Sequence, residues 1–153
     1  MLPYMWGSQA KCYCGTTAVM TNGMTVFTVG GGPIQILEIF SVCITANGAT
    51  ASTMQWNLTP TVGSAKTLSA ASASLANLEA GSTVTLNPTS LATAPTIVSA
   101  EAGGVSICAN VSNRIIIPDG VISLVIGVGS TTGTWKHYIR YEPLAPDAMI
   151  NGN

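Results

Sequence analysis

Short runs of β-branched and aromatic residues, each closed by a Gly, Pro or Asn turn, recur along this chain of 153 residues. They lie at residues 24–29, 34–45, 52–60, 105–111, 113–120, 121–128 and 134–144. Apolar residues at every second position are typical of strands, and no segment has the length and period of a helix that would connect parallel strands. The pattern predicts seven to nine short strands and an all-β fold, an antiparallel β-sandwich or jelly roll.

The length is that of one domain, and neither an internal repeat nor a linker divides the chain. We place the β-sandwich domain at residues 24–153. Residues 1–23 mix aromatic side chains with Gly, Pro and Ser and show no sustained period, so we expect an extended N-terminal arm. Its aromatic residues are Tyr4, Trp6 and Tyr13. Such an arm can pack on its own domain or on a neighbouring molecule.

The run IQILEIFSVCIT, residues 34–45, predicts a central strand with apolar side chains on both faces. Strict alternation places Ile34, Ile36, Phe40, Val42 and Ile44 on one face, and Leu37, Ile39 and Cys43 on the other. Glu38 interrupts the first face. It therefore requires a partner, a bulge that turns it outward, or an exposed end of the sheet.

An Asn-Gly pair at residues 47–48 favours a tight turn after this strand. The following segment STMQWNLTP, residues 52–60, alternates cleanly, with Met54, Trp56 and Leu58 inward. We therefore expect the two segments to pair as a hairpin.

The middle of the chain, residues 64–106, is poor in large apolar residues and rich in Ala, Ser and Thr. Short strands are plausible at Lys66 to Ala70 and at Thr83 to Leu86. A helical turn over residues 69–81, closed by Gly81, is the alternative for part of this stretch, because Ala and Leu are good helix formers.

The segment GTWKHYIRYEPL, residues 133–144, contains the only histidine of the chain. Alternation places Trp135, His137, Ile139 and Tyr141 on one face, and Lys136, Tyr138 and Arg140 on the other. His137 is expected to pack among aromatic side chains. A Ser-His-Asp site with Asp119 or Asp147 as the orienting acid is the alternative, but the chain lacks the Gly-x-Ser-x-Gly motif.

The opposite face of this strand, with two cations beside Tyr138, is suited to hold a carboxylate or an aromatic ring. It is either an exposed face kept soluble by its charges or a subunit contact. The possible acidic partners for such a contact are Glu38, Glu79, Glu101 and Glu142. Pro143 is expected to end the strand, because proline donates no ladder hydrogen bond.

Only 7% of the residues are charged, against 47% hydrophobic, so charge cannot cover the surface of a free monomer in the usual way. The 19 Thr, 14 Ser and 16 Gly residues supply an uncharged surface that suits strands and contact with partner chains. We therefore expect an assembled protein. The chain has no cluster of Lys and Arg residues of the kind that binds nucleic acid directly. Neither a secretory signal nor a membrane span is visible.

The four cysteines, Cys12, Cys14, Cys43 and Cys108, lack the paired spacing of a zinc site, and reduced or buried thiols are expected. We expect no metal, no cofactor and no catalytic residue. The tryptophans leave open a carbohydrate-binding module in which Trp6, Trp56 and Trp135 stack on sugars. Core positions are favoured for Trp56 and Trp135, because both lie on the apolar faces of their strands.

Three pieces carry a resemblance to a known family: GGPIQILEIFSVCITANGATASTMQWNLTPT (residues 31–61), NRIIIPDGVISLVIG (residues 113–127) and STTGTWKHYIRYEPLAPDA (residues 130–148). They resemble the apolar first strand, the Ala/Thr-rich second strand, the Pro-x-Gly turn and the closing strand of small structural, head decoration-like proteins of tailed double-stranded DNA bacteriophages. The motifs mark strands and turns and include no catalytic residue.

The resemblance implies a capsid decoration, or cement, protein that binds the major capsid protein and itself, most often as a homotrimer. Such a protein is made in the bacterial cytoplasm and lies on the capsid surface of the virion. The residues expected to contact a subunit or the capsid are Tyr4, Trp6, Tyr13, Lys136, Tyr138 and Arg140. A tail or receptor-binding component of the virion, and a carbohydrate-binding β-sandwich module, are the alternatives.

Overall fold

The computed structural model describes residues 10–86, 90–103 and 115–152, which form an all-β fold. The strands are β1 (Lys11–Cys14), β2 (Ala18–Thr21), β3 (Thr25–Gly30), β4 (Ile34–Cys43), β5 (Thr53–Pro60), β6 (Lys66–Thr67), β7 (Thr83–Thr85), β8 (Thr96–Val98), β9 (Ile115–Ile117), β10 (Gly120–Gly127), β11 (Ser130–Pro143) and β12 (Met149–Gly152). In the described part of the chain the one helical element is the 3₁₀ turn η1 (Ala100–Ala102). The described residues contain twelve strands, more than the expected seven to nine, because β1, β2, β8 and β12 were not predicted. The strand expected at residues 105–111 lies outside the described residues.

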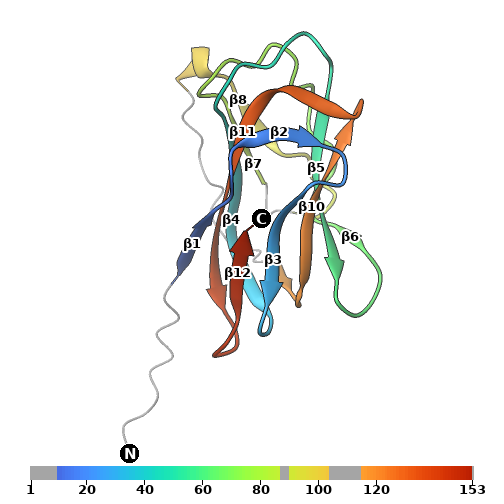
Figure 1. Cartoon of the computed structure of the whole chain (residues 1–153), viewed down its shortest axis with the longest axis vertical. Helices are drawn as coiled ribbons and strands as arrows, with labels where there is room; N and C mark the ends of the chain where they lie inside the picture. Colours follow the sequence, from blue (N-terminus) through green and yellow to red (C-terminus); the bar gives the residue numbers. More distant parts are fainter. Residues whose placement is uncertain (1–9, 87–89, 104–114, 153) are drawn as a thin grey trace, which may run out of the picture.

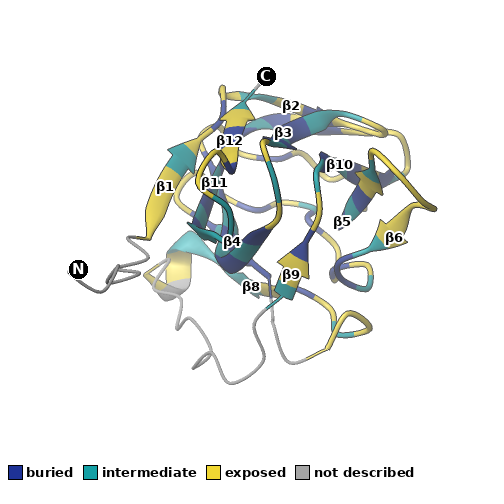
Figure 2. Ribbon diagram, turned by 90° about the horizontal axis from the view of Figure 1, so that it is seen from below, coloured by how far each residue is buried: buried dark blue, intermediate teal, exposed yellow. Residues whose placement is uncertain are grey.

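The strands form two antiparallel sheets (Figure 1). The seven-stranded sheet has the order β1-β11-β4-β7-β8, with β2 also paired to β11 and β9 also paired to β4. The five-stranded sheet has the order β12-β3-β10-β5-β6. Seen from below, the strands of the two sheets surround a common interior (Figure 2). The expectation of an antiparallel, sandwich-like all-β fold is confirmed.

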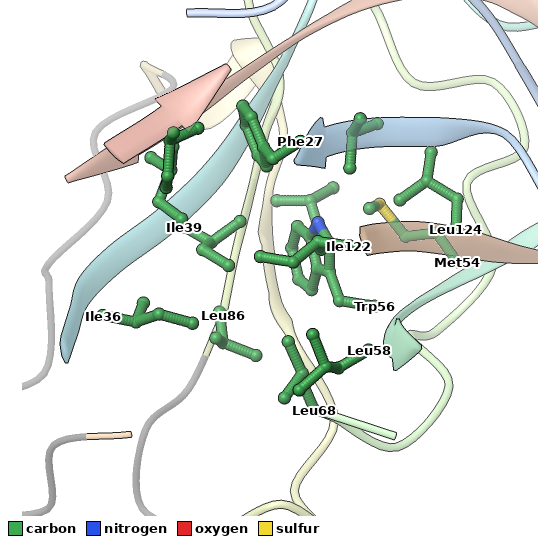
Figure 3. Packing of buried hydrophobic residues seen from close by; sticks show 14 of the residues in the cluster. Phe27, Ile36, Ile39, Met54, Trp56, Leu58, Leu68, Leu86, Ile122 and Leu124 are labelled. Carbon is green, nitrogen blue, oxygen red and sulfur yellow. The ribbon is translucent and has the colours of Figure 1, made fainter. Parts of the chain in front are cut away.

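The interior is filled by large apolar side chains from both sheets. Ile36, Ile39 and Leu86 come from the side of the seven-stranded sheet, and Figure 3 shows them close to side chains of the five-stranded sheet. Trp56 and Trp135 are both 0% exposed, which confirms that they are core residues. Burial of such side chains from water is the main favourable contribution to folding.

The expected hairpin between residues 34–45 and 52–60 is wrong. Strand β4 belongs to the seven-stranded sheet and β5 to the five-stranded sheet, so the connection between them passes from one sheet to the other. Asn47 is buried there. Its Nδ2 donates to the carbonyl oxygen of Leu75 at 2.9 Å, and its Oδ1 accepts from the Gly133 N–H at 2.8 Å. The Asn-Gly pair thus anchors the crossover and has no positive φ of the kind that a tight hairpin turn requires.

Strict alternation along β4 is also wrong, because the strand bulges. Arg140 of β11 faces Glu38, while the next residue, Tyr141, faces Ile36, so Leu37 is the extra residue. After the bulge Ile39 points inward, and Phe40 moves to the outer face. Two of the three options left open for Glu38 are realised: the bulge turns it outward, and Arg140 of β11 is its partner.

The described part of the expected arm, from residue 10 onward, packs on its own domain. Strands β1 and β2 run antiparallel to β11 along one edge of the seven-stranded sheet. Between them the Gly15 N–H donates to the His137 carbonyl oxygen at 2.9 Å, so the two strands follow β11 almost without interruption. Tyr4 and Trp6 lie outside the described residues.

The middle of the chain contains short strands at both expected places, β6 and β7. The alternative of a helical turn over residues 69–81 is wrong, since this stretch consists of bends and turns. It runs beside β5, where the Oγ atoms of Ser69 and Ser72 accept hydrogen bonds from the backbone N–H groups of Trp56 and Met54, at 3.3 and 3.0 Å. Serine side chains that bond to backbone in this way compete with helix formation.

Candidate interaction surfaces

The outer face of the seven-stranded sheet carries the aromatic and charged side chains expected from residues 134–144. Trp135, His137, Ile139 and Tyr141 are buried, and the residues between them are half-buried on the outer side, as alternation predicted. Because of the bulge in β4, two further side chains join this face: Glu38 lies beside Arg140, and Phe40 lies beside Tyr138. We call Glu38, Phe40, Lys136, Tyr138 and Arg140 the aromatic–cation face.

The rings of Phe40 and Tyr138 stack across the strand pair. Their centroids are 4.8 Å apart and the ring planes differ by 8°. The Nζ atom of Lys136 lies 5.8 Å from the centre of the Tyr138 ring, within the range of a cation–π contact. The sequence predicted Tyr138 between two cations but not Phe40, because alternation without a bulge placed Phe40 on the same face as Ile34 and Ile36, which are buried.

Arg140 is paired inside the chain. Its Nη2 donates to Glu38 Oε1 at 2.9 Å, with 41% of the Arg140 side chain and 24% of the Glu38 side chain exposed. Of the four acidic residues considered as partners for this face, Glu38 is thus the one that pairs with Arg140, and it belongs to the same chain. Glu79 and Glu101 are exposed elsewhere on the chain.

An open pocket of about 310 Å³ lies at the β1 edge of this face. Its lining residues are Cys12, Tyr13, Cys14, Glu38, Phe40, Tyr138, Ile139 and Arg140. Cys12 is in register with Arg140 and Cys14 with Tyr138, so two small side chains border two large ones. We call this hollow the edge pocket.

The three cysteines in the described residues are free thiols, exposed at Cys12 and Cys14 and buried at Cys43. Burial raises the pKa of the Cys43 thiol, opposed by a hydrogen bond from the Asn47 backbone. Within residues 10–86, 90–103 and 115–152 no cluster of three or more His, Cys, Asp or Glu side chains could hold a metal ion. Cys108 lies outside the described residues.

Tyr13 was expected to contact a partner, but its ring turns into the chain's own fold. It meets the Phe27 ring edge-to-face, with the centroids 6.2 Å apart and the planes at 90°. It also lies against Gly152 of β12, where an added Cβ would overlap the Tyr13 ring. Tyr13 therefore joins the edges of the two sheets, and among the expected contact residues in the described chain only those of β11 lie on the outer face.

His137 is 1% exposed and faces the interior. Its Nδ1 lies 2.7 Å from Ser41 Oγ, while Nε2 has no hydrogen-bond partner in the described part of the chain. An unpaired acceptor costs less than an unpaired N–H, so we assign the proton to Nδ1, which donates to Ser41. Burial lowers the pKa of His137 to about 4.

The acids considered as orienting partners for His137 lie elsewhere. Asp119 Oδ1 accepts a hydrogen bond from the Gly32 N–H at 2.7 Å, and Asp147 is exposed. A tryptophan platform for sugars is also not formed by the two described tryptophans, because both are fully buried.

The outer face of the five-stranded sheet has a different chemistry. Strands β3, β5, β10 and β12 contain no charged residue, and the short edge strand β6 carries the exposed Lys66. The outward side chains of the four uncharged strands include Thr25, Thr28, Thr53, Gln55, Asn57, Thr59, Val121, Ser123, Val125, Met149 and Asn151. We call this the uncharged face. Val125 of β10, in register with Gln55 of β5, is 40% exposed.

No protein-family model matches the sequence, and neither curated proteins nor solved structures give a significant match to it. In the described residues, no helix is long and apolar enough to cross a membrane.

Proposed function

We propose that this chain is a non-enzymatic structural protein of a tailed-phage virion, a decoration or cement protein that binds the major capsid protein on the capsid surface. The observation that carries the proposal is the uncharged face: four adjoining strands present only Thr, Ser, Asn, Gln and aliphatic side chains outward. A face without charges can be covered by a partner without burying an unpaired ion. The resemblance of residues 31–61, 113–127 and 130–148 to phage head proteins supports the virion assignment.

The size of the chain allows a specific contact of this kind. The chain has an accessible surface of 7745 Å², and a standard interface buries about 800 Å² on each partner, or roughly a tenth of that surface. Each copy would then bridge neighbouring capsid subunits and oppose the outward pressure of packaged DNA through many burial and hydrogen-bond contacts.

We further propose that the sandwich is a jelly roll. The strand orders β1-β11-β4-β7 and β3-β10-β5-β6 pair early strands with late ones in both sheets. The chain passes from one sheet to the other between β2 and β3, β3 and β4, β4 and β5, β6 and β7, β9 and β10, β10 and β11, and β11 and β12. Double-sheet jelly rolls occur in viral capsid and lectin domains. Fold alone does not fix function, so this likeness supports the virion proposal only as an analogy.

The second surface, the aromatic–cation face, is proposed as the contact between copies in a homotrimer. It combines a ring stack, a cation–π contact and an apolar pocket, and aromatic and Arg side chains are enriched at the centres of protein interfaces. In this arrangement the uncharged face remains for the capsid.

Co-sedimentation with expanded capsids that lack the protein tests the proposal. We expect the purified chain to sediment with the capsids, and the Val125→Lys variant to lose most of this binding, because it buries a charge without a partner. Ile116→Lys is the matched control, since Ile116 is an exposed aliphatic residue on β9 of the other sheet. Wild-type protein that stays in the supernatant overturns the proposal. Equal capsid binding by Val125→Lys and Ile116→Lys would exclude the uncharged face as the contact with the capsid.

A further inference from the structure

The edge pocket owes its shape to side-chain size. Along β1 the two outward residues are Cys12 and Cys14, and each stands beside a large side chain of β11, Arg140 or Tyr138. The large side chains form the walls, and the short thiol side chains leave the edge open. The pocket volume of about 310 Å³ is at the lower end of the range that accommodates small ligands or single large side chains.

The chemistry of the pocket favours an uncharged aromatic occupant. Its wall is the Phe40–Tyr138 stack, which presents ring surface, and the exposed part of the Arg140 guanidinium, which can lie over another ring. The charge of Arg140 is already balanced by Glu38 at 2.9 Å. A charged occupant would bury an ion without a partner, whereas a neutral aromatic side chain would not.

The strand beside the pocket is open on one side. Within the described residues β1 pairs with β11 only and forms an end of the seven-stranded sheet. An extended segment can add to such an edge through backbone hydrogen bonds and place alternate side chains in pockets beside it.

The chain itself contains a segment of this kind. Nine residues, MLPYMWGSQ, precede Ala10; they carry two aromatic rings and no charged side chain. Fully extended, nine residues span about 30 Å. Trp6 is only six positions before Cys12. To enter the pocket of its own copy the chain would have to reverse direction within residues 7–10, whereas the pocket of a neighbour requires no reversal.

We propose that the edge pocket binds the N-terminal segment of a second copy of this chain, with Trp6 as the anchoring side chain. The inference rests on the self-association part of the proposed function and is independent of the capsid. It gives the homo-oligomer a specific link: each copy donates residues 1–9 and receives those of a neighbour.

The free thiols of the pocket allow a direct test in the full-length chain. In a Met5→Cys variant, which keeps the Trp6 anchor, mild oxidation is expected to form a disulfide between residue 5 of one copy and Cys14 or Cys12 of another. The measurement is a non-reducing gel, with mass spectrometry of the linked peptides. A covalent dimer or larger chain of copies with this linkage is the expected result. A linkage within one chain, or none, overturns the proposal.

The matched control moves the thiol along the same edge. In a Met5→Cys, Cys12→Ser, Cys14→Ser, Thr21→Cys variant the receiving thiol is on β2, which is also exposed and also paired to β11 but lies outside the pocket. No linkage between residues 5 and 21 is expected. Abundant linkage there would show that the segment collides without a preferred site and would overturn the proposal.

A second measurement does not require a cross-link. Trp6→Ala removes the anchor, and Cys14→Phe fills the pocket; each is expected to raise the concentration at which oligomers dissociate by tenfold or more in analytical ultracentrifugation. Thr21→Phe, with the same added bulk outside the pocket, is expected to leave it unchanged. Oligomers unaffected by both changes contradict the inference. Capsid co-sedimentation of the same variants then shows whether only the contact between copies is wrong or whether the decoration role fails as well.

Discussion

Arg140 donates a 2.9 Å hydrogen bond to Glu38 on the neighbouring strand, and it does so because β4 bulges at Leu37. The bulge turns an acid that alternation would bury toward the outer face, where it meets a cation. It also brings Phe40 onto the same face, beside Tyr138. One extra residue in a strand thus produces the ion pair, the ring stack and part of the edge pocket.

The ion pair is expected to contribute little to stability. Both side chains remain partly in water, and exposed pairs typically contribute about 0.2–1 kcal/mol. We expect Glu38→Gln to lower the free energy of unfolding by less than about 1 kcal/mol in urea denaturation. Addition of salt should narrow the difference between the variant and the wild type. A loss of several kcal/mol would mean that the pair is structural and that the outer face is less solvated than described.

Stability is expected to fall as the pH drops from about 6.5 to about 4, because of His137. Burial lowers its pKa in the folded chain from 6.5 to about 4, so the unfolded chain binds the proton more readily in this range. The stabilisation is complete above pH 6.5 and is lost as the pH falls toward 4. Its size is about 3 kcal/mol.

The variant His137→Gln serves as the control for this prediction, since an amide can still bond to Ser41 and does not titrate. Urea denaturation at pH 7 and pH 4.5 should show a smaller pH-dependent loss for the variant than for the wild type. Titration of the His137 ring protons by NMR measures the pKa directly. A pKa near 6.5 would contradict the buried position.

The two core tryptophans are expected to respond differently to the same substitution. Both are 0% exposed, but Trp135 Nε1 donates to Asn47 Oδ1 at 3.4 Å, whereas Trp56 Nε1 has no partner in the described residues. Trp135→Phe removes a hydrogen bond, and Trp56→Phe removes an unpaired N–H. We expect Trp56→Phe to cost about 1 kcal/mol less in thermal or urea unfolding. A larger cost for Trp56→Phe would contradict the assignment of its Nε1 as unpaired.

Gly133 is expected to be intolerant of any side chain. A Cβ there would lie 2.7 Å from Asn47 Oδ1 and would overlap the carbonyl oxygen of Thr45. Gly133→Ala should therefore destabilise the chain by about 2 kcal/mol, the usual cost of overpacking. Gly30→Ala is the control, because no atom lies within 4 Å of its added Cβ and its φ is not positive. Equal effects of the two changes would argue against the crossover geometry around Asn47.

Much of the fold could be predicted from local pattern. Clean alternation in residues 53–58 and 134–142 gave the correct inward residues, since one face of each strand is buried and the period is two. The errors arose where non-local contacts override local preference. The Asn-Gly pair favoured a turn, but the buried Asn47 side chain bonds to Leu75 and Gly133, which are far away in sequence.

The candidate surface was half predicted. The outward positions of Lys136, Tyr138 and Arg140 followed from alternation. Glu38 on an otherwise apolar face was the signal for a bulge, but the position of the bulge is set by the pairing of β4 with β11, which the sequence pattern does not show. Alternation puts Cys12 and Cys14 on one face of a strand, but the sequence does not show which side chains lie beside them. They become pocket residues because β1 lies in register with β11, a pairing across more than a hundred residues.

The location of the protein in the virion is the most direct test of the central claim. Low-resolution electron microscopy of wild-type particles and of particles made without this chain compares the density on heads and tails. The decoration role predicts that density at regular positions on the capsid surface disappears from the heads and that the tails are unchanged. Unchanged heads together with density lost from the tail would contradict it.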